Sequence, residues 1–394
     1  MPNFTFTQVP GDQRLEYHVY GGHPKFCVVC KRDNPTSLLF CTISPDGVLV
    51  HEFSVNSPSP RHLITGFIWH PLDPSIFFTQ TNGGIITCHC INDAEKRVEI
   101  IGTTDIDDNF ITFKLNTTGT NMVVVLDGAE TAMLYSLRQS EYGAMTFEFV
   151  SSMTFDEIEI NAVEFFGDNI IAYGLNDGSI HIDEIGKGGR MTDIVPNLGE
   201  ILAVRFSPDG KFFAVVAEYG LSIYEADSER FVFGLIGEIF NEDDFFTKVS
   251  LEWHNSLPLL VGTFVRQFSG VYGMTEVMFL GVSDSEINQI HSQIFQHASL
   301  CGIFIHPTLP LAICGYYGTT HGEVLVWNFK NSVRFPLERL LLMRNALYKQ
   351  DLPEDIIEQV LRKTFGSHLS FEKFKHHCSL PPVKLLPPSK ESSE

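Results

Sequence analysis

Few residues of this chain have the types and spacing that enzyme chemistry requires. Cys27 and Cys30 have the spacing of a zinc-binding pair, but they lie in an apolar run that predicts a strand, where an odd offset places the two side chains on opposite faces. His376, His377 and Cys378 lack the second pair of ligands that a structural zinc site needs. The chain has no Gly-rich phosphate loop, nucleophile elbow or His-Glu-x-x-His helix. We therefore expect no catalytic residue, no metal site and no cofactor.

The remaining cysteines and histidines fit structural roles. Cys88 and Cys90 share one face of a predicted strand, where free Cys behaves as a small hydrophobe. His70 and His306 each precede a proline in a turn, where a polar side chain can tie the turn to its strand. No apolar run approaches the ~20 residues of a membrane helix, and the first residues lack the pattern of a signal peptide. We expect free thiols, no membrane partner, and a cytoplasmic location with the nucleus as an open second compartment.

Acidic residues form clusters between the predicted strands. Residues 1–329 hold 40 acidic and 16 basic side chains, a net charge of −24, whereas residues 330–394 hold 8 and 11, a net charge of +3. An acidic body repels nucleic acid phosphates and steers basic proteins toward itself, although such charge can also serve solubility alone. If the clusters share one rim, they form a patch that binds a basic client. The candidate client-binding residues are Asp105, Asp107, Asp108, Glu238, Glu242, Asp243 and Asp244, and a third cluster is Asp156, Glu157 and Glu159.

A composite pattern of apolar strand, polar turn, second strand, Gly-containing turn and third strand recurs along the chain. The copies span Gly66–Ile91, Thr112–Leu137, Ala162–Ile185, Ala203–Ala226, Ser250–Phe264 and Gly302–Phe329. Their equivalent points are Trp69, Leu115, Phe165, Phe206, Trp253 and Ile305, which are 46, 50, 41, 47 and 52 residues apart. These spacings bracket and slightly exceed the ~40–45 residues of a propeller blade.

The repeats predict an all-β fold, a β-propeller of about seven blades over residues 1–333. The segment Lys25–Phe53 is a less regular copy that makes seven, and the first ~20 residues are free to supply a closing strand. The pattern resembles the WD-repeat family, and Val326-Trp327-Asn328 approaches the usual blade ending of that family. A β-sandwich would need fewer strands and no long period.

A helical period follows the last blade. Leucines recur at offsets of three, four and seven, and Asp351 to Asp355 reads as the start of a second helix that stops at Gly366. We expect a short C-terminal helical appendix at 334–369 and a disordered tail at 370–394.

The appendix resembles a SOCS box, through Pro336-Leu337 with Leu340-Leu341 and then Leu352-Pro353 with Ile356. The resemblance implies that the first helix binds elongin C, and with it elongin B, and that the Leu-Pro segment meets a cullin. Leu-Pro-Glu-Asp at 352–355, in place of Leu-Pro-Leu-Pro, favours cullin-2. The implied docking residues are Leu337, Leu340, Leu341, Leu352, Pro353 and Ile356.

A WD propeller followed directly by such a box resembles a nematode class of substrate receptor that presents CCCH zinc-finger proteins for ubiquitylation. The resemblance implies a client-binding subunit of an elongin–cullin-2 ubiquitin ligase that makes no bond itself. One alternative is a WD scaffold whose C-terminal helices pack on the propeller. Another is a propeller enzyme with a polar site in the central channel, which we disfavour because no charged group converges there by pattern.

Overall fold

The structure, a computed structural model, describes most of residues 3–328. The described ranges are 3–8, 17–20, 26–31, 37–44, 49–57, 63–92, 95–106, 110–126, 130–187, 190–227, 232–240, 245–254, 259–268, 271–282, 286–295, 299–306, 311–317 and 322–328. Within these ranges every regular element is a β-strand, and no helix there is long and apolar enough to cross a membrane. The expected helices at 334–369 and the expected tail at 370–394 lie outside the described residues.

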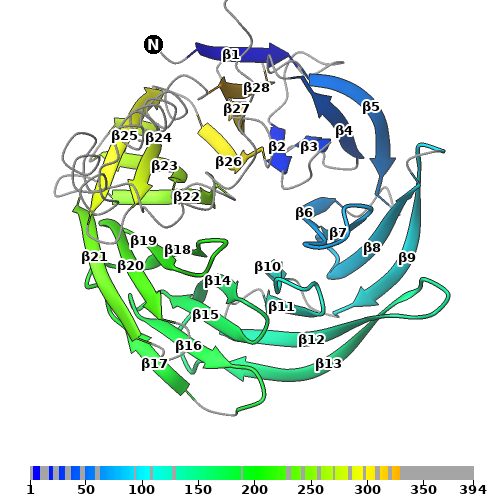
Figure 1. Ribbon diagram of the computed structural model, residues 1–394, viewed down its shortest axis with the longest axis horizontal. Helices are drawn as coiled ribbons and strands as arrows, with labels where there is room; N and C mark the ends of the chain where they lie inside the picture. The colour runs from blue at the N-terminus through cyan, green and yellow to red at the C-terminus, as the bar shows by residue number, and fades with distance from the viewer. Residues whose placement is uncertain are drawn as a thin grey trace, which may run out of the picture.

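The strands form four-stranded antiparallel sheets, which are arranged as blades around a central channel (Figure 1). We call the strands of a blade a to d, from the channel outward. The first blade contains β2 (Tyr17–Tyr20), β3 (Phe26–Lys31), β4 (Ser37–Ile43) and β5 (Leu49–Asn56). The second contains β6 (Ile64–Trp69), β7 (Ile76–Thr81), β8 (Ile85–Asn92) and β9 (Arg97–Asp105). The third contains β10 (Phe110–Leu115), β11 (Asn121–Leu126), β12 (Thr131–Gln139) and β13 (Met145–Thr154). Three more are β14 (Ile160–Phe166), β15 (Ile170–Leu175), β16 (Ile180–Glu184) and β17 (Arg190–Ile194); β18 (Ile201–Phe206), β19 (Phe212–Ala217), β20 (Gly220–Asp227) and β21 (Val232–Phe240); and β22 (Phe245–Trp253), β23 (Leu259–Phe268), β24 (Val271–Val282) and β25 (Ile287–Phe295).

These six sheets are each built from four consecutive strands, whereas the remaining sheet joins the two ends of the ring. It contains β26 (Ser299–Ile305), β27 (Leu311–Tyr317) and β28 (Gly322–Asn328), and its outermost strand is β1 (Asn3–Gln8). Phe4 pairs with Trp327 and Phe6 with Leu325 in antiparallel register. The expected propeller and the closing strand from the first residues are therefore confirmed.

The repeat pattern located the innermost strands correctly. The equivalent points lie at the channel-side strand of each blade, where Trp69, Leu115, Phe206 and Trp253 are the last residues of β6, β10, β18 and β22. Each is cross-strand to the start of strand b, as Trp69 is to Phe77. The turn that follows is therefore the a–b turn of every blade.

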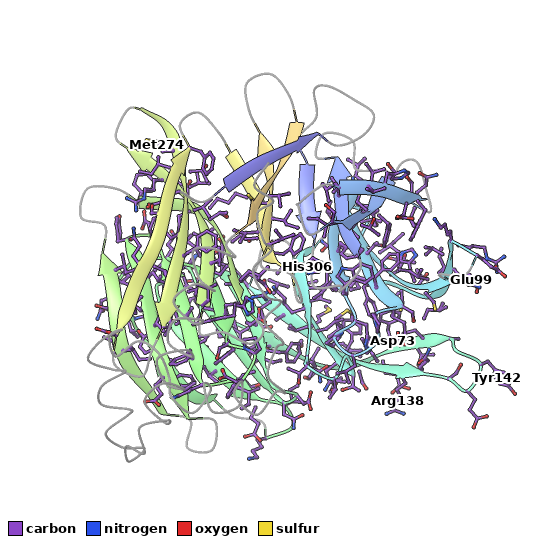
Figure 2. The ribbon with its side chains drawn as sticks, turned by 45° about the horizontal axis from the view of Figure 1, so that its top comes forward. Asp73, Glu99, Arg138, Tyr142, Met274 and His306 are labelled. Carbon is purple, nitrogen blue, oxygen red and sulfur yellow. The ribbon has the colours of Figure 1, made fainter. Side chains whose placement is uncertain are left out.

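In the five blades from β6–β9 to β22–β25, the three-strand pattern covered the inner strands and missed strand d. Strand d lies on the outside of the ring, so its residues are largely exposed and show no apolar run, as in β13. Figure 2 shows how far the β12–β13 hairpin projects, with Tyr142 at its end. The segment beginning at Lys25 also supplies strands b to d of its blade, and its strand a is the short β2.

The core lies between neighbouring blades and is richest in the b strands. All six residues of β19 are buried, as are all six of β7, because each strand b has a blade packed on both of its faces. β19 is a continuous apolar run, whereas β7 ends in the buried polar residues Thr79, Gln80 and Thr81. Burying one Val or Phe of this kind contributes about 1.5–3 kcal/mol, so these runs hold the blades together.

Candidate functional site

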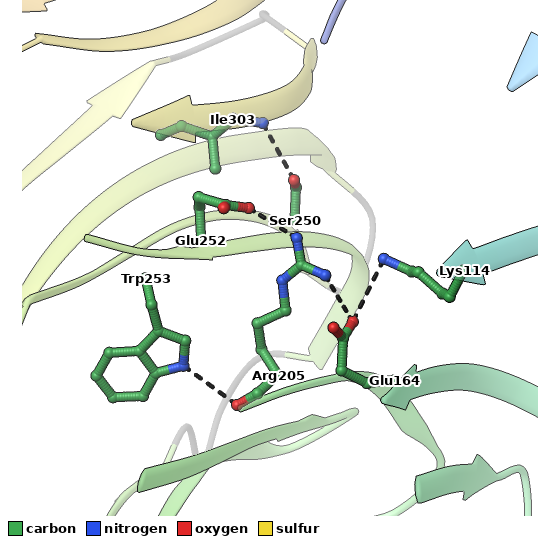
Figure 3. A network of polar contacts seen from close by, with 7 residues as sticks. All are labelled: Lys114, Glu164, Arg205, Ser250, Glu252, Trp253 and Ile303. Atoms are coloured by element: carbon green, nitrogen blue, oxygen red, sulfur yellow. Dashed lines mark hydrogen bonds and ion pairs between the residues drawn. The ribbon is translucent and has the colours of Figure 1, made fainter. Parts of the chain in front are cut away.

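Four charged side chains of alternating sign line the central channel. Lys114, Glu164, Arg205 and Glu252 lie at the same position of strand a in four consecutive blades, on β10, β14, β18 and β22. Arg205 bridges two of the other blades, with Nη1 2.5 Å from Glu164 Oε2 and Nη2 2.8 Å from Glu252 Oε2. Lys114 Nζ lies 3.4 Å from Glu164 Oε2 (Figure 3). We call this set the channel network.

Neighbouring hydrogen bonds fix the strands that carry the channel network. Trp253 Nε1 donates to the backbone oxygen of Arg205 over 3.1 Å, which ties β22 to β18. The backbone N–H of Ile303 donates to Ser250 Oγ over 3.1 Å, which ties β26 to β22 (Figure 3). The charged groups are thus held by rigid strands rather than by loops.

The channel network is largely shielded from water. The exposed fractions of the side chains are 27% for Lys114, 16% for Glu164, 25% for Arg205 and 30% for Glu252. Burial alone would raise the pKa of Glu164, but Arg205 and Lys114 outweigh it and hold the pKa below its ordinary value. Burial would likewise lower the pKa of Arg205, but Glu164 and Glu252 raise it. Burial and repulsion by Arg205 lower the pKa of Lys114.

The channel network corrects the expectation that no charged group converges in the channel. Its members were visible in the sequence, because each immediately precedes an equivalent point of the repeat: Leu115, Phe165, Phe206 or Trp253. The signal is a charged residue repeated at one blade position, which an aligned set of repeats reveals and a search for catalytic motifs does not. In the network, Arg205 contacts Glu164 and Glu252, and Lys114 contacts Glu164.

Acidic side chains gather on one face of the ring. In an antiparallel sheet of order a-b-c-d, the b–c and d–a connections open on the same face, and the a–b and c–d connections on the other. Among the described residues of these connections, the three blades from β10 to β21 carry carboxylates and no Lys or Arg. The carboxylates are Glu130, Asp156, Glu157, Glu159, Asp177, Glu200 and Glu218, which we call the acidic face.

Backbone hydrogen bonds hold the connections of the acidic face together. The N–H of Phe155 donates to the oxygen of Glu130 over 2.8 Å, and the N–H of Asn176 donates to that of Glu159 over 2.9 Å. The N–H of Glu218 donates to the oxygen of Glu200 over 2.9 Å. All these acidic side chains except the half-buried Glu218 are exposed, so the face presents carboxylates from a firmly held backbone.

The structure brings only part of the predicted client-binding set to this face. Asp105 is the last residue of β9 and lies at the edge of the acidic face. Glu238 lies inside β21 and accepts a hydrogen bond from Ser222 Oγ over 3.0 Å. Both were expected between strands, and that was wrong because each belongs to a missed outer strand. Two intervening blades separate them. Asp107, Asp108, Glu242, Asp243 and Asp244 lie outside the described residues.

Of the other residues singled out in the sequence, some lie outside the described residues and others can be compared with the structure. The docking residues Leu337, Leu340, Leu341, Leu352, Pro353 and Ile356 all lie outside the described residues. His70 has the structural role expected of it, since its Nδ1 accepts the N–H of Asp73 over 3.0 Å and that of Leu72 over 3.3 Å. Among the described residues no cluster of three or more His, Cys, Asp or Glu could hold a metal ion.

These features define the chain as a β-propeller, with a fold like that of WD propellers. It is similar to the β-propeller domain of Cps50 (Swd1) from Myceliophteria thermophila, with a TM-score of 0.62 and 10% sequence identity over 83% of this chain and 99% of that one. Likeness at this identity shows the fold. No protein-family model matches the chain, and no curated protein matches its sequence.

Proposed function

We propose that the chain is a non-catalytic receptor that binds a basic client protein through the acidic face of its propeller. The observation that carries the proposal is the gathering of exposed carboxylates, without Lys or Arg among the described residues, on the b–c and d–a connections of three blades. Such a surface steers a basic partner and repels an acidic one. The fold supports this use, because WD-type propellers commonly act as protein-binding scaffolds.

We further propose that the receptor belongs to an elongin–cullin-2 ubiquitin ligase. Support comes from the SOCS-like residues, with Leu337, Leu340 and Leu341 meeting elongin C and Leu352, Pro353 and Ile356 meeting cullin-2. The order of propeller and box resembles the nematode zinc-finger-interacting factor, a receptor for CCCH zinc-finger proteins. A CCCH protein, usually basic, fits the sign of the acidic face.

The mechanism of such a receptor is proximity. A client held on the propeller presents its lysines to the ubiquitin-charged enzyme of the ligase at a high effective concentration. The receptor supplies binding geometry, and the client is then degraded by the proteasome. The second candidate is a WD scaffold whose C-terminal helices cover part of its own propeller, with no ligase attached.

Neutralising the acidic face tests the client-binding proposal. In the full chain, Asp156→Asn, Glu157→Gln and Glu159→Gln together should weaken the binding of a basic CCCH zinc-finger domain about tenfold at low salt, chiefly through the association rate. The matched control is Glu95→Gln, Glu99→Gln and Glu141→Gln, which removes the same charge near the opposite face. Surface plasmon resonance gives both rates. Equal weakening by the two variants would favour an acidic surface that serves solubility alone.

A further inference from the structure

A cavity of about 1010 Å³ opens on the face opposite the acidic face. Its walls are the a–b turns of the blades β10–β13, β14–β17 and β18–β21, at Asn116, Gly167 and Ser207. Glu164, Arg205 and Glu252 of the channel network also line this cavity. Its volume is at the upper end of the range for ligand pockets.

The walls of this channel cavity are held in place before any ligand arrives. Asp168 reaches from one blade to the next and accepts the hydroxyl of Thr117 over 2.7 Å and the N–H of Thr118 over 3.1 Å. Asn116 Nδ2 donates to the backbone oxygen of Asp168 over 3.2 Å. Phe166 stacks on Phe206, with ring centroids 4.4 Å apart. A ligand would therefore meet a preformed site and would spend little binding energy on ordering it.

The charge of the lining favours a cation. The cavity is lined by five carboxylates, Glu164, Asp168, Glu184, Asp209 and Glu252, and by two cations, Lys187 and Arg205. Both cations contact lining carboxylates, because Lys187 Nζ lies 2.9 Å from Glu184 Oε2 and Arg205 bridges Glu164 and Glu252. Asp168 accepts hydrogen bonds from the Thr117 hydroxyl and the Thr118 N–H, which lower its pKa. Both donors are neutral, so they do not cancel its negative charge. An anionic ligand would face net repulsion.

We infer that the channel cavity is a second binding site, which accepts a Lys or Arg side chain from an extended segment of a partner protein. A guanidinium or ammonium group can approach Glu252, which is the most exposed member of the channel network. Glu252 already forms an ion pair with Arg205, and a ligand cation would form the same kind of charge-assisted contact. The inference goes beyond the proposed function, because this site lies on the face away from the client.

Binding of a defined peptide tests this inference in the full chain. The probe is a fluorescein-labelled, amidated (Arg-Gly)₄ peptide, measured by fluorescence anisotropy at low and physiological salt. Glu252→Gln and Glu184→Gln should each weaken its binding about tenfold, since each removes a charge-assisted contact. The matched control, Glu141→Gln in the exposed β12–β13 hairpin away from both surfaces, should change it less than about twofold.

Three further arms make the result decisive. A peptide with citrulline in place of arginine keeps the shape and loses the charge, so it should bind at least about tenfold more weakly. A photoreactive version of the arginine peptide should label residues 164–170 or 205–210. Spermidine should compete only weakly, because the proposed ligand is a protein side chain.

Several outcomes would overturn the inference. They are absence of peptide binding, equal weakening by Glu141→Gln, equal binding of the citrulline peptide, or spermidine binding that matches the peptide. Melting temperatures of the variants are measured alongside, and Glu184→Gln, at the edge of the cavity, remains informative if Glu252→Gln unfolds the chain. A wild-type chain that binds the peptide but binds no basic client would contradict only the proposed function.

Discussion

Removing the guanidinium at the centre of the channel network should destabilise the propeller far more than removing an exposed one. Arg205→Met keeps an unbranched side chain of similar reach but leaves Glu164 and Glu252 without the cation that bridges them. Two carboxylates then lie in a channel where they are 16% and 30% exposed. Lys114 still offsets part of the charge of Glu164, but Arg205 no longer offsets the mutual repulsion and poor hydration of the two carboxylates.

The size of the effect follows from the degree of burial. Breaking a fully buried ion pair costs about 3–5 kcal/mol, while an exposed pair contributes about 0–1 kcal/mol. Because these groups are mostly but not fully shielded, we expect a loss of about 2–3 kcal/mol in the free energy of unfolding. For a chain of this length that corresponds to a fall of about 2–4 °C in melting temperature.

The assay is urea and thermal unfolding of the full chain, followed by circular dichroism. The matched control is Arg138→Met, which removes an arginine 3.3 Å from Glu148, where the two side chains are 69% and 52% exposed. That variant should lose less than about 0.5 kcal/mol. Adding Glu252→Gln to Arg205→Met, which leaves Glu164 paired with Lys114, should recover part of the loss. If Arg205→Met unfolds no more easily than Arg138→Met, the channel network does not stabilise the propeller.

Three other changes have defined outcomes. Burial lowers the pKa of His89 to about 4, so the folded chain binds fewer protons than the unfolded chain below pH 6.5. The free energy of unfolding should therefore fall by about 3 kcal/mol as the pH falls from 6.5 to 4. His89→Gln should flatten that slope in urea titrations. Gly119→Ala should lower the free energy of unfolding by about 1–2 kcal/mol more than Gly143→Ala. Both glycines have positive φ, but only at Gly119 would a Cβ lie 2.2 Å from His70. Melting curves of the two variants measure the difference. If Leu337 docks elongin C, Leu337→Asp should leave the melting temperature within about 1 °C of wild type and abolish elongin C capture; a large drop in melting temperature would favour the scaffold with packed helices.

Sequence periodicity was enough to predict the propeller because its inner strands are buried on both sides. Runs such as Phe212–Ala217 must be apolar when a blade covers each face, and they recur once per blade. The outer strands have no such constraint. Half-exposed β9 and β21 were therefore read as loops, which misplaced Asp105 and Glu238.

The two candidate sites differ in how far the sequence could predict them. The acidic clusters were visible as composition, but only the alternating course of the strands puts Asp156, Glu159 and Glu200 on one face. The channel network needs the ring itself, because Lys114 and Glu252 are 138 positions apart in the sequence and meet only when four blades surround one channel.

We propose that one chain joins a basic client to a ligase core. The direct measurement is capture of a CCCH zinc-finger protein on immobilised elongin B–elongin C, with and without the full chain. Capture should require the wild-type chain, should be lost with Leu337→Asp, and should weaken with Asp156→Asn, Glu157→Gln and Glu159→Gln together. A wild-type chain that binds the client but never brings it to elongin C would contradict the claim.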